Sequence, residues 1–335
     1  MSRLRLGRVA MRPDKAVLVG RSAHADRRGA QGLLATWLAS SPPDAAIEIA
    51  PERVSAATLA SRGSSLNVQS HATEALPAGA VVASLAAHNI VDQAAVTSAV
   101  RAVLGRLEGR VSRVALIVPD VAAKVSLVRF DTIPARRDDL DQLVRWQVRK
   151  SAPFPIDDAC VSYSRGAAGP DGGGEFVVVL ARRDIVEEYE RVCAAAGVYA
   201  GLVDLATFSA LNSVLAAPNA PSGDWLAVHM RPGYTSIAIV RGEDMIFFRN
   251  RPEDEDESLT DLVHQTAMYY QDRLAGQGFS RVLLGGSGRA PGAVDLAQRG
   301  LEERLATRVE AMGPSDVLTP LMGMLLRTRR EAVGV

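Results

Sequence analysis

The segment Pro153-Phe154-Pro155 constrains the fold of this chain more than any other stretch. A proline has no backbone N–H and restricts the residue before it, so a helix has to end before this point. Residues 138–150 predict that helix, with acidic residues in its first turn and apolar residues at near-helical spacing (Leu140, Leu143, Val144, Trp146 and Val148). Residues 160–163 then alternate like a strand. We therefore expect a helix, a stop and a strand around a small core that contains Trp146 and Phe154.

Length and composition indicate an ordinary globular protein of two domains or two lobes. The chain has 335 residues, of which 47% are hydrophobic and 23% are charged, and its formal net charge is zero. This balance gives no global attraction to nucleic acid or to membranes, and no apolar run reaches the length of a membrane span. Because no clear secretory signal is present either, we expect a cytoplasmic protein.

The chain lacks the residue sets that metal sites and common catalytic sites need. Cys160 and Cys193 are the only cysteines, and we expect buried free thiols rather than a disulfide. The five histidines are scattered without the spacing of metal ligands. The sequence contains no Walker loop, no nucleophile elbow and no pair of carboxylates in a recognisable catalytic motif. We therefore expect no bound metal and no catalytic residue.

The remaining segments predict an α/β fold with an insert. A Gly-rich stretch at 166–174 could cradle phosphate only if it opened a helix, and here it joins two strands, which favours a flexible hairpin loop. We expect a first lobe (45–121, 184–222 and 315–330), an inserted subdomain (122–183) and a second lobe (223–314). The expected strands are 47–49, 54–59, 65–73, 114–118, 124–130, 160–163, 176–180, 225–228, 235–241, 245–248 and 282–284, and the expected helices are 92–107, 138–150, 184–196, 205–215, 257–274, 294–305 and 317–329.

The order of these motifs resembles that of the type IV pilus assembly protein PilM family, within the actin-like ATPase superfamily. The resemblance rests on the helix with Trp146 before Pro-Phe-Pro and an acid pair, and on two hairpins at 47–59 and 226–240. It continues through a Gly-Gly turn at 285–288 and a closing helix at 319–327, so it covers roughly residues 45–330. It implies a two-lobed actin-like (ribonuclease H-like) fold with a small α+β insert in the first lobe. A fold analogy carries no function by itself.

The same resemblance implies an ATP site between the lobes, where two hairpins of the form Asp-x-Gly hold the phosphates. Glycine lets the backbone approach the phosphates, and the aspartate orients the hydration shell of Mg²⁺. The first hairpin departs from this pattern, because Glu48 replaces the aspartate and Ala50 replaces the glycine. Pro51 also removes an N–H donor.

The second hairpin is altered as well, with His229 at the aspartate position and Arg231-Pro232 in place of the glycine and its neighbour. Five acidic residues at 253–257 would repel a triphosphate unless a metal neutralised them; their other interpretation is a solvated loop that opens the next helix. Arg53 and Arg231 could supply charge for phosphates, but we interpret them as surface arginines. The candidates for a degenerate ATP site are Glu48, Arg53, Gly233, Thr235, Gly285, Gly286, Ser287 and Gly288.

Two functions from different classes are consistent with these motifs. The resemblance implies a cytoplasmic scaffold of a pilus or related secretion platform, peripheral to the inner membrane, which binds the tail of a PilN-like bitopic protein. That tail would lie extended in a groove between the first lobe and the insert. Apolar residues expected along the groove, each also a candidate for the core of the insert, are Val125, Leu127, Leu143, Trp146 and Phe154. The alternative is an active ATPase or small-molecule kinase, which would need ATP, Mg²⁺ and competent phosphate hairpins.

The first 44 residues fall outside the resemblance. Residues 1–40 carry eight basic side chains against two acidic ones, and Leu33, Leu34, Trp37 and Leu38 then form one apolar face. One interpretation is a basic amphipathic element that touches an anionic membrane surface. The other is a mobile extension, or a gene start placed too far upstream.

Overall fold

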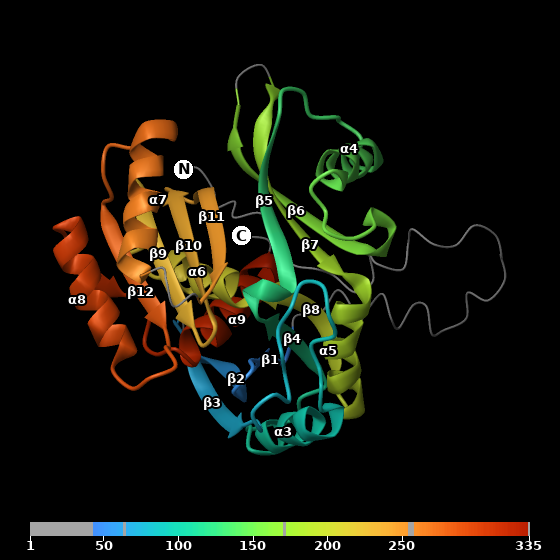
Figure 1. Ribbon diagram of the computed structural model, residues 1–335. Helices are drawn as coiled ribbons and strands as arrows, with labels where there is room; N and C mark the ends of the chain where they lie inside the picture. Colours follow the sequence, from blue (N-terminus) through green and yellow to red (C-terminus); the bar gives the residue numbers. More distant parts are fainter. Residues whose placement is uncertain (1–42, 63–64, 170–171, 254–257, 334–335) are drawn as a thin grey trace.

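The structure is a computed structural model that describes residues 43–62, 65–169, 172–253 and 258–333. Its strands form three sheets, two of five strands and one of three. Figure 1 shows the two larger sheets in separate lobes, with the three-stranded sheet above the first of them. The basic N-terminal segment and residues 254–257 of the acidic run lie outside the described residues, so the interpretations given for them stay predictions.

The first lobe is built on a mixed sheet in the order β3-β2-β1-β4-β8. β1 pairs antiparallel with β2 and parallel with β4, so the first predicted hairpin forms. β1 and β4 are apolar almost throughout because both faces of the sheet are buried. The strands are Ala45–Ile49 (β1), Arg53–Arg62 (β2), Ser65–Ala75 (β3), Arg113–Val118 (β4) and Tyr199–Leu205 (β8).

Helices cover both faces of this sheet. α3 and α5 pack on one face, against Ile47 and Leu116. On the other face, α9 packs against small residues of the sheet and also against α6. The two helices approach closely at Gly323, where a Cβ would lie 1.8 Å from the carbonyl oxygen of Ser209, so only glycine fits. The helices are Gln93–Gly105 (α3), Arg183–Ala195 (α5), Ala206–Ala216 (α6) and Leu318–Val333 (α9).

The second lobe is built on the sheet β11-β10-β9-β12-β13. β9, β10 and β11 form the predicted antiparallel meander, and β12 runs parallel to both β9 and β13. α7 and α8 pack on one face of the sheet. The other face turns toward α6, where the rings of Phe208 and Phe248 lie 5.3 Å apart. The elements are Asp224–Arg231 (β9), Tyr234–Arg241 (β10), Asp244–Pro252 (β11), Leu259–Arg273 (α7), Arg281–Gly286 (β12), Ala293–Leu305 (α8) and Val309–Ala311 (β13).

The insert leaves the first lobe after β4 and returns to it at α5. Its antiparallel sheet has the order β5-β7-β6, and the first residue of β5, Ala123, pairs with Ala181 near the end of β7. α4 packs on one face of this sheet through Val144 and Val148, with Phe154 partly buried beside them. The elements are Asp120–Ala122 (η1, a 3-10 helix), Ala123–Phe130 (β5), Arg137–Arg149 (α4), Ile156–Asp158 (η2, a 3-10 helix), Ala159–Ala168 (β6) and Gly174–Arg182 (β7).

The differences from the predicted elements have simple causes. The sequence pattern does not predict β8, which contains Gly201, or β13, which has only three residues. Trp146 is 66% exposed, so its expected place in the core of the insert is wrong. Val144 and Val148 face that core, and a residue two positions away from each lies on the opposite side of the helix.

Other expectations about the insert and the cysteines are confirmed. The strands on either side of the Gly-rich stretch, β6 and β7, pair with each other as expected of a hairpin, and residues 170–171 of the stretch lie outside the described residues. Cys160 and Cys193 are buried free thiols. The insert also touches the second lobe, because β5 lies against β11 (Figure 1). Within the described part of the chain, no helix combines the length and the apolar character needed to cross a membrane.

Candidate functional sites

The facing hairpins of the two lobes meet in a buried ion pair. Glu48 in β1 is 1% exposed and Arg231 at the end of β9 is 5% exposed. Arg231 Nη2 lies 2.5 Å from Glu48 Oε1. Burial raises the pKa of Glu48, and the Arg231 guanidinium opposes that rise. Burial alone would lower the pKa of Arg231, but the Glu48 carboxylate raises it, so the guanidinium stays charged.

The interpretation of Arg231 and Arg53 as surface arginines is therefore wrong. A guanidinium can be buried when a carboxylate faces it, and Glu48 meets that condition for Arg231. The side chain of Arg53, at the start of β2, is 13% exposed. Its Nη2 lies 3.0 Å from Asp316 Oδ2 and its Nη1 lies 3.1 Å from Glu52 Oε1. Arg53 thus ties the first hairpin to the segment that precedes α9.

Asp120, which follows β4, is the centre of a second buried group. It is fully buried and accepts hydrogen bonds from the backbone N–H of Thr207 at 3.0 Å, from the Thr207 hydroxyl and from the Ser236 hydroxyl at 2.6 Å. Burial raises the pKa of Asp120, and these hydrogen bonds oppose the rise. Asp120 and Thr207 belong to the first lobe and Ser236 to the second, so the group joins the two lobes.

His229 completes this group. Its Nδ1 lies 2.8 Å from Thr207 Oγ1, whose own proton is directed to Asp120. The hydroxyl therefore accepts from His229, which places the imidazole proton on Nδ1. Burial and the positive charges of Arg231 and Arg53 hold the pKa of His229 well below its usual value, so the ring is neutral. We name Glu48, Asp120, Thr207, His229, Arg231 and Ser236 the inter-lobe cluster.

A carboxylate of the chain itself occupies the turn of the second hairpin. Gly233 has a φ of +94°, and its N–H donates to Glu253 Oε2 at 3.2 Å. The same oxygen lies 2.6 Å from Arg289 Nε. Thr235 follows in β10, partly exposed and paired with neighbouring strands on both sides. The amide that the resemblance assigns to a phosphate thus already has an anionic acceptor.

Packing within the fold explains the two glycines that end β12. Gly286 has a φ of +95°, and a Cβ there would lie 1.9 Å from the carbonyl oxygen of Met230. At Gly285 a Cβ would lie 2.8 Å from the Cβ of Met312. The N–H of Ser287 donates to that same Met230 carbonyl at 2.9 Å. The fold itself therefore requires these glycines.

The eight predicted nucleotide-site residues come from three places in the fold. Glu48 and Arg53 lie at the first hairpin, and Gly233 and Thr235 lie at the second. The other four, 285–288, lie at the end of β12, where a Cβ on Gly288 would come within 2.5 Å of the Cβ of Ala293. Among these eight residues, Glu48 belongs to the inter-lobe cluster, where its side chain pairs with Arg231 of the other lobe.

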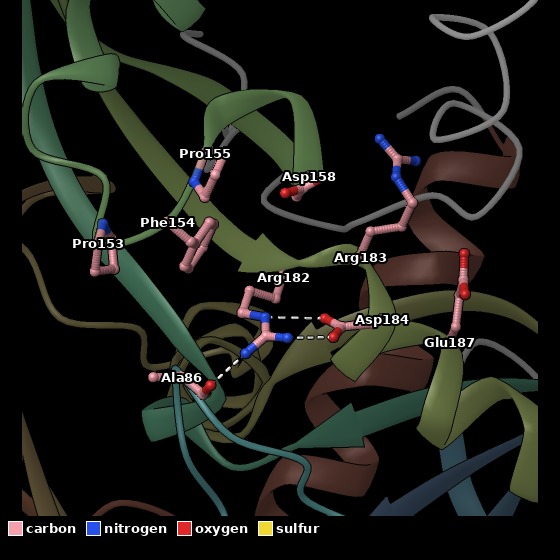
Figure 2. Close-up of a pocket in the computed structure, with 9 residues that line it drawn as sticks. All are labelled: Ala86, Pro153, Phe154, Pro155, Asp158, Arg182, Arg183, Asp184 and Glu187. Atoms are coloured by element: carbon pink, nitrogen blue, oxygen red, sulfur yellow. Dashed lines mark hydrogen bonds and ion pairs between the residues drawn. The ribbon is translucent and has the colours of Figure 1, made fainter.

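A groove separates the insert from the first lobe (Figure 2). Its volume is about 460 Å³, which is within the range of ligand pockets. Figure 2 shows Phe154 between its two prolines, with its ring directed toward Arg182. We name this the insert groove; it is lined by Ala86, Pro153, Phe154, Pro155, Asp158, Arg182, Arg183, Asp184 and Glu187.

Charged side chains of both signs line the insert groove. Arg182 Nε donates to Asp184 Oδ1 at 3.0 Å, and its two terminal nitrogens donate to Asp184 Oδ2 and to the carbonyl oxygen of Ala86 (Figure 2). Asp158 and Glu187 add two carboxylates, and Arg183 adds a second guanidinium. A ligand in the groove would meet an aromatic ring, two prolines and several charged groups.

The five apolar residues predicted to contact a partner are not brought together. Phe154 lines the insert groove, and the other four are absent from its lining among the described residues. Val125 packs against a core cluster that contains residues of both lobes, and Leu143 packs against the core of the insert. Leu127 is half-buried in β5, and Trp146 is exposed on the outer side of α4.

A model of the type IV pilus assembly protein PilM family matches residues 46–269. The matched segment is about two-thirds of the 335 residues and contains the first hairpin, the whole insert and the second hairpin. The chain belongs to the PilM family. The resemblance to the PilM family that the sequence motifs indicate is thereby confirmed.

Solved structures show the same fold in other proteins. A PilM-PilN type IV pilus biogenesis complex matches with a TM-score of 0.72 at 15% identity, covering 85% of this chain and 98% of that chain. A Bacteroides thetaiotaomicron protein with an actin-like ATPase fold and unknown function matches with a TM-score of 0.50 at 8% identity, covering 86% and 96%. At such identities the likeness shows the fold alone, which is the predicted actin-like α/β fold. A search of curated proteins found no match.

In this PilM-family chain, sequence reasoning missed Asp120, Thr207 and Ser236. Asp120 lies 87 positions from Thr207 and 116 from Ser236, so only the folded chain brings them together. Asp120 did carry a signal, because it follows a buried parallel strand at the carboxyl edge of the sheet, where sites form in α/β folds. The charged groove residues, such as Arg182 and Asp184, showed no comparable pattern.

Proposed function

We propose that this PilM-family protein is a scaffold subunit of a type IV pilus assembly platform that binds the cytoplasmic tail of a PilN-like, single-span membrane protein in the insert groove. The observation that supports this most strongly is that Pro153-Phe154-Pro155, the segment on which the family resemblance rests, lines that groove. The similar structure with a TM-score of 0.72 is a PilM-PilN complex, which makes a PilN-like tail the first partner to test. Membrane association would then come through the partner.

The lining of the insert groove suits an extended peptide. Phe154 and the prolines offer apolar contact to alternate side chains, while Arg183, Asp158 and Glu187 offer charged partners. A tail that becomes ordered when it binds loses conformational entropy, so we expect modest affinity and a reversible complex.

The binding test uses fluorescently labelled tail peptides from bitopic proteins encoded beside this chain, with anisotropy as the readout. Phe154→Ala should weaken binding about tenfold or more, which corresponds to about 1.4 kcal/mol, because it removes the aromatic side chain from the groove lining. Trp146→Ala is the matched control, since this aromatic residue also belongs to the insert but is exposed on the outer side of α4. If Phe154→Ala binds the tail as tightly as Trp146→Ala does, the binding site lies elsewhere. If no tail binds to the wild type, the proposed scaffold function is wrong.

We infer that the site between the lobes binds Mg²⁺-ATP weakly or not at all, which disfavours the alternative of an active ATPase or kinase. The support is that Glu48 is engaged by Arg231, that Asp120 receives three hydrogen bonds from the chain, and that the Gly233 amide donates to Glu253. Groups that are already paired have little to offer a phosphate or a hydrated metal ion. Calorimetry with Mg²⁺-ATP at micromolar protein should detect no heat, and a clear one-to-one isotherm would overturn this proposal.

A further inference from the structure

One wall of the insert groove is a loop, residues 80–92, which carries Ala86. The loop is held by a buried carboxylate of α5. Glu188 is 7% exposed, and its Oε2 accepts the backbone N–H of Asn89 at 2.8 Å and that of Ile90 at 3.1 Å. Its Oε1 pairs with His88 Nδ1. One side chain therefore binds three consecutive residues of the wall.

The loop is also braced from within. Asn89 is fully buried; its side chain accepts the Ser84 N–H at 2.9 Å and donates to the Tyr189 hydroxyl at 3.2 Å. The backbone N–H of Val82 donates to the Asn89 carbonyl at 2.9 Å. Arg182, which also lines the groove, donates to the Ala86 carbonyl (Figure 2).

This arrangement makes the wall depend on Glu188. A backbone N–H that is turned away from water needs an acceptor, and the loop contains only an isolated bridge between Val81 and Ile90 as regular structure of its own. A charged acceptor binds such donors more strongly than a neutral one. Ala86 lies three positions before Asn89, so the place of Ala86 in the groove follows from where Asn89 and Ile90 are held.

We propose that Glu188 is a positioning residue that holds loop 80–92 as a preformed wall of the insert groove. A preformed wall spares the tail the cost of ordering the loop when it binds. This inference rests on the proposed function of the groove, but the state of the wall can be measured without any partner. A merely structural role for Glu188 would change global stability and leave the loop and the affinity unaffected in the folded protein.

The experiment compares full-length wild type, Glu188→Ala, Glu188→Gln and Glu190→Ala. Hydrogen exchange of peptides from loop 80–92 is measured without partner, and tail affinity is measured by anisotropy. In Glu188→Ala the loop should exchange faster while β1 and β4 stay protected. A wall that is in place only about a tenth of the time would raise the apparent Kd of the tail about tenfold.

The other variants separate the geometry of the anchor from its charge. Glu188→Gln should restore most of the loop protection and of the tail affinity that Glu188→Ala loses, because its amide oxygen can still accept both backbone N–H groups, although without the charge. Glu190→Ala is the matched control on the same helix; Glu190 Oε1 has no hydrogen-bond partner within the described chain, so both readouts should match wild type. If Glu188→Ala does not fold, Glu188→Asp replaces it, since the shorter side chain keeps the charge and withdraws the acceptor from the loop.

Each result has a definite meaning. Unchanged loop exchange in Glu188→Ala, or in Glu188→Asp when it replaces that variant, would overturn the anchor. Faster loop exchange with unchanged tail affinity would overturn the positioning role, and so would failure of Glu188→Gln to restore either readout. If the wild type binds no tail, the proposed function fails, while the exchange measurements still decide whether Glu188 holds the wall.

Discussion

The inter-lobe cluster and the insert groove use charged side chains in opposite ways. In the cluster, Glu48 and Arg231 are buried against each other, and the Asp120 carboxylate accepts three hydrogen bonds from Thr207 and Ser236. In the groove, Asp158 and Glu187 line an open volume of about 460 Å³. The charged groups of the inter-lobe cluster are thus paired within the chain, whereas charged groups of the insert groove line an open volume. Function therefore has to be argued from each site and not from the fold.

The largest effect on stability is expected when one member of the buried ion pair in the inter-lobe cluster is removed. Arg231→Met leaves the Glu48 carboxylate buried without its partner, so the free energy of unfolding should fall by about 3–5 kcal/mol. Urea unfolding measures the loss. The double variant Glu48→Met/Arg231→Met is the control, because replacing both partners by apolar groups should recover most of the stability. A double variant as unstable as the single one would contradict the pairing.

The next largest effect is expected at the glycine turn. Gly286→Ala introduces a Cβ at a positive φ and against the Met230 carbonyl, so it should cost about 2–4 kcal/mol. Gly79→Ala is the matched control: its φ is also positive, at +80°, but nothing lies within 4 Å of the added Cβ. Equal losses in the two variants would show that the close contact at Gly286 contributes nothing. Thermal unfolding of the two variants side by side gives the answer.

A smaller effect, which depends on pH, is expected at Glu190. This carboxylate belongs neither to the inter-lobe cluster nor to the lining of the insert groove. Burial and the neighbouring Glu187 raise the pKa of Glu190 to about 7. The folded protein therefore holds this proton more tightly than the unfolded chain, so the contribution to stability is complete below the ordinary glutamate pKa and is lost as pH rises through about 7. Glu190→Gln should be more stable than wild type at about pH 8, by about 1–2 kcal/mol. The stability difference between wild type and Glu190→Gln should shrink toward about pH 5, and a constant difference would contradict the assignment.

The smallest effect is expected at Trp146, and it sharpens the distinction between the groove and the outer surface of the insert. Trp146→Ala should change the free energy of unfolding by less than about 0.5 kcal/mol, because its side chain is 66% exposed. Phe154→Ala, at a half-buried position, should cost about 1–2 kcal/mol. Denaturant titration of the pair tests this, and a loss at Trp146 as large as that at Phe154 would show that Trp146 is packed.

The helix around Trp146 shows how far local patterns reach. The prolines, the alternation of strands and the spacing of Val144 and Val148 predict the elements of the insert, because these features act within a few residues. If Val144 and Val148 define the buried face of the helix, Trp146, which is two positions from each, lies on the outer face. Sequence reasoning placed it in the core by treating every apolar residue as part of one stripe.

Arg231 shows where local patterns stop. Arginine is rarely buried, so a surface position is the natural expectation from its identity alone. Its burial depends on Glu48, which is 183 positions away, and no local pattern connects the two. The hydrogen bonds of Asp120 to Thr207 and Ser236 depend on contacts of the same kind. The hairpins on which these residues lie could be predicted, but the pairing between hairpins could not.

The way in which the insert is attached has a consequence for how chains of this family can be recombined. The first residue of β5 and the penultimate residue of β7 are opposite each other in the sheet, as Ala123 and Ala181. Paired residues of antiparallel strands are about 4.5–5.5 Å apart, so the chain enters and leaves the insert through one narrow neck. The insert can therefore be exchanged between relatives as one unit. Such an exchange would replace Pro153-Phe154-Pro155, whereas α5 and loop 80–92, which form the other side of the groove, would stay unchanged. Binding assays on such chimaeras would test whether either half of the groove determines which partner binds.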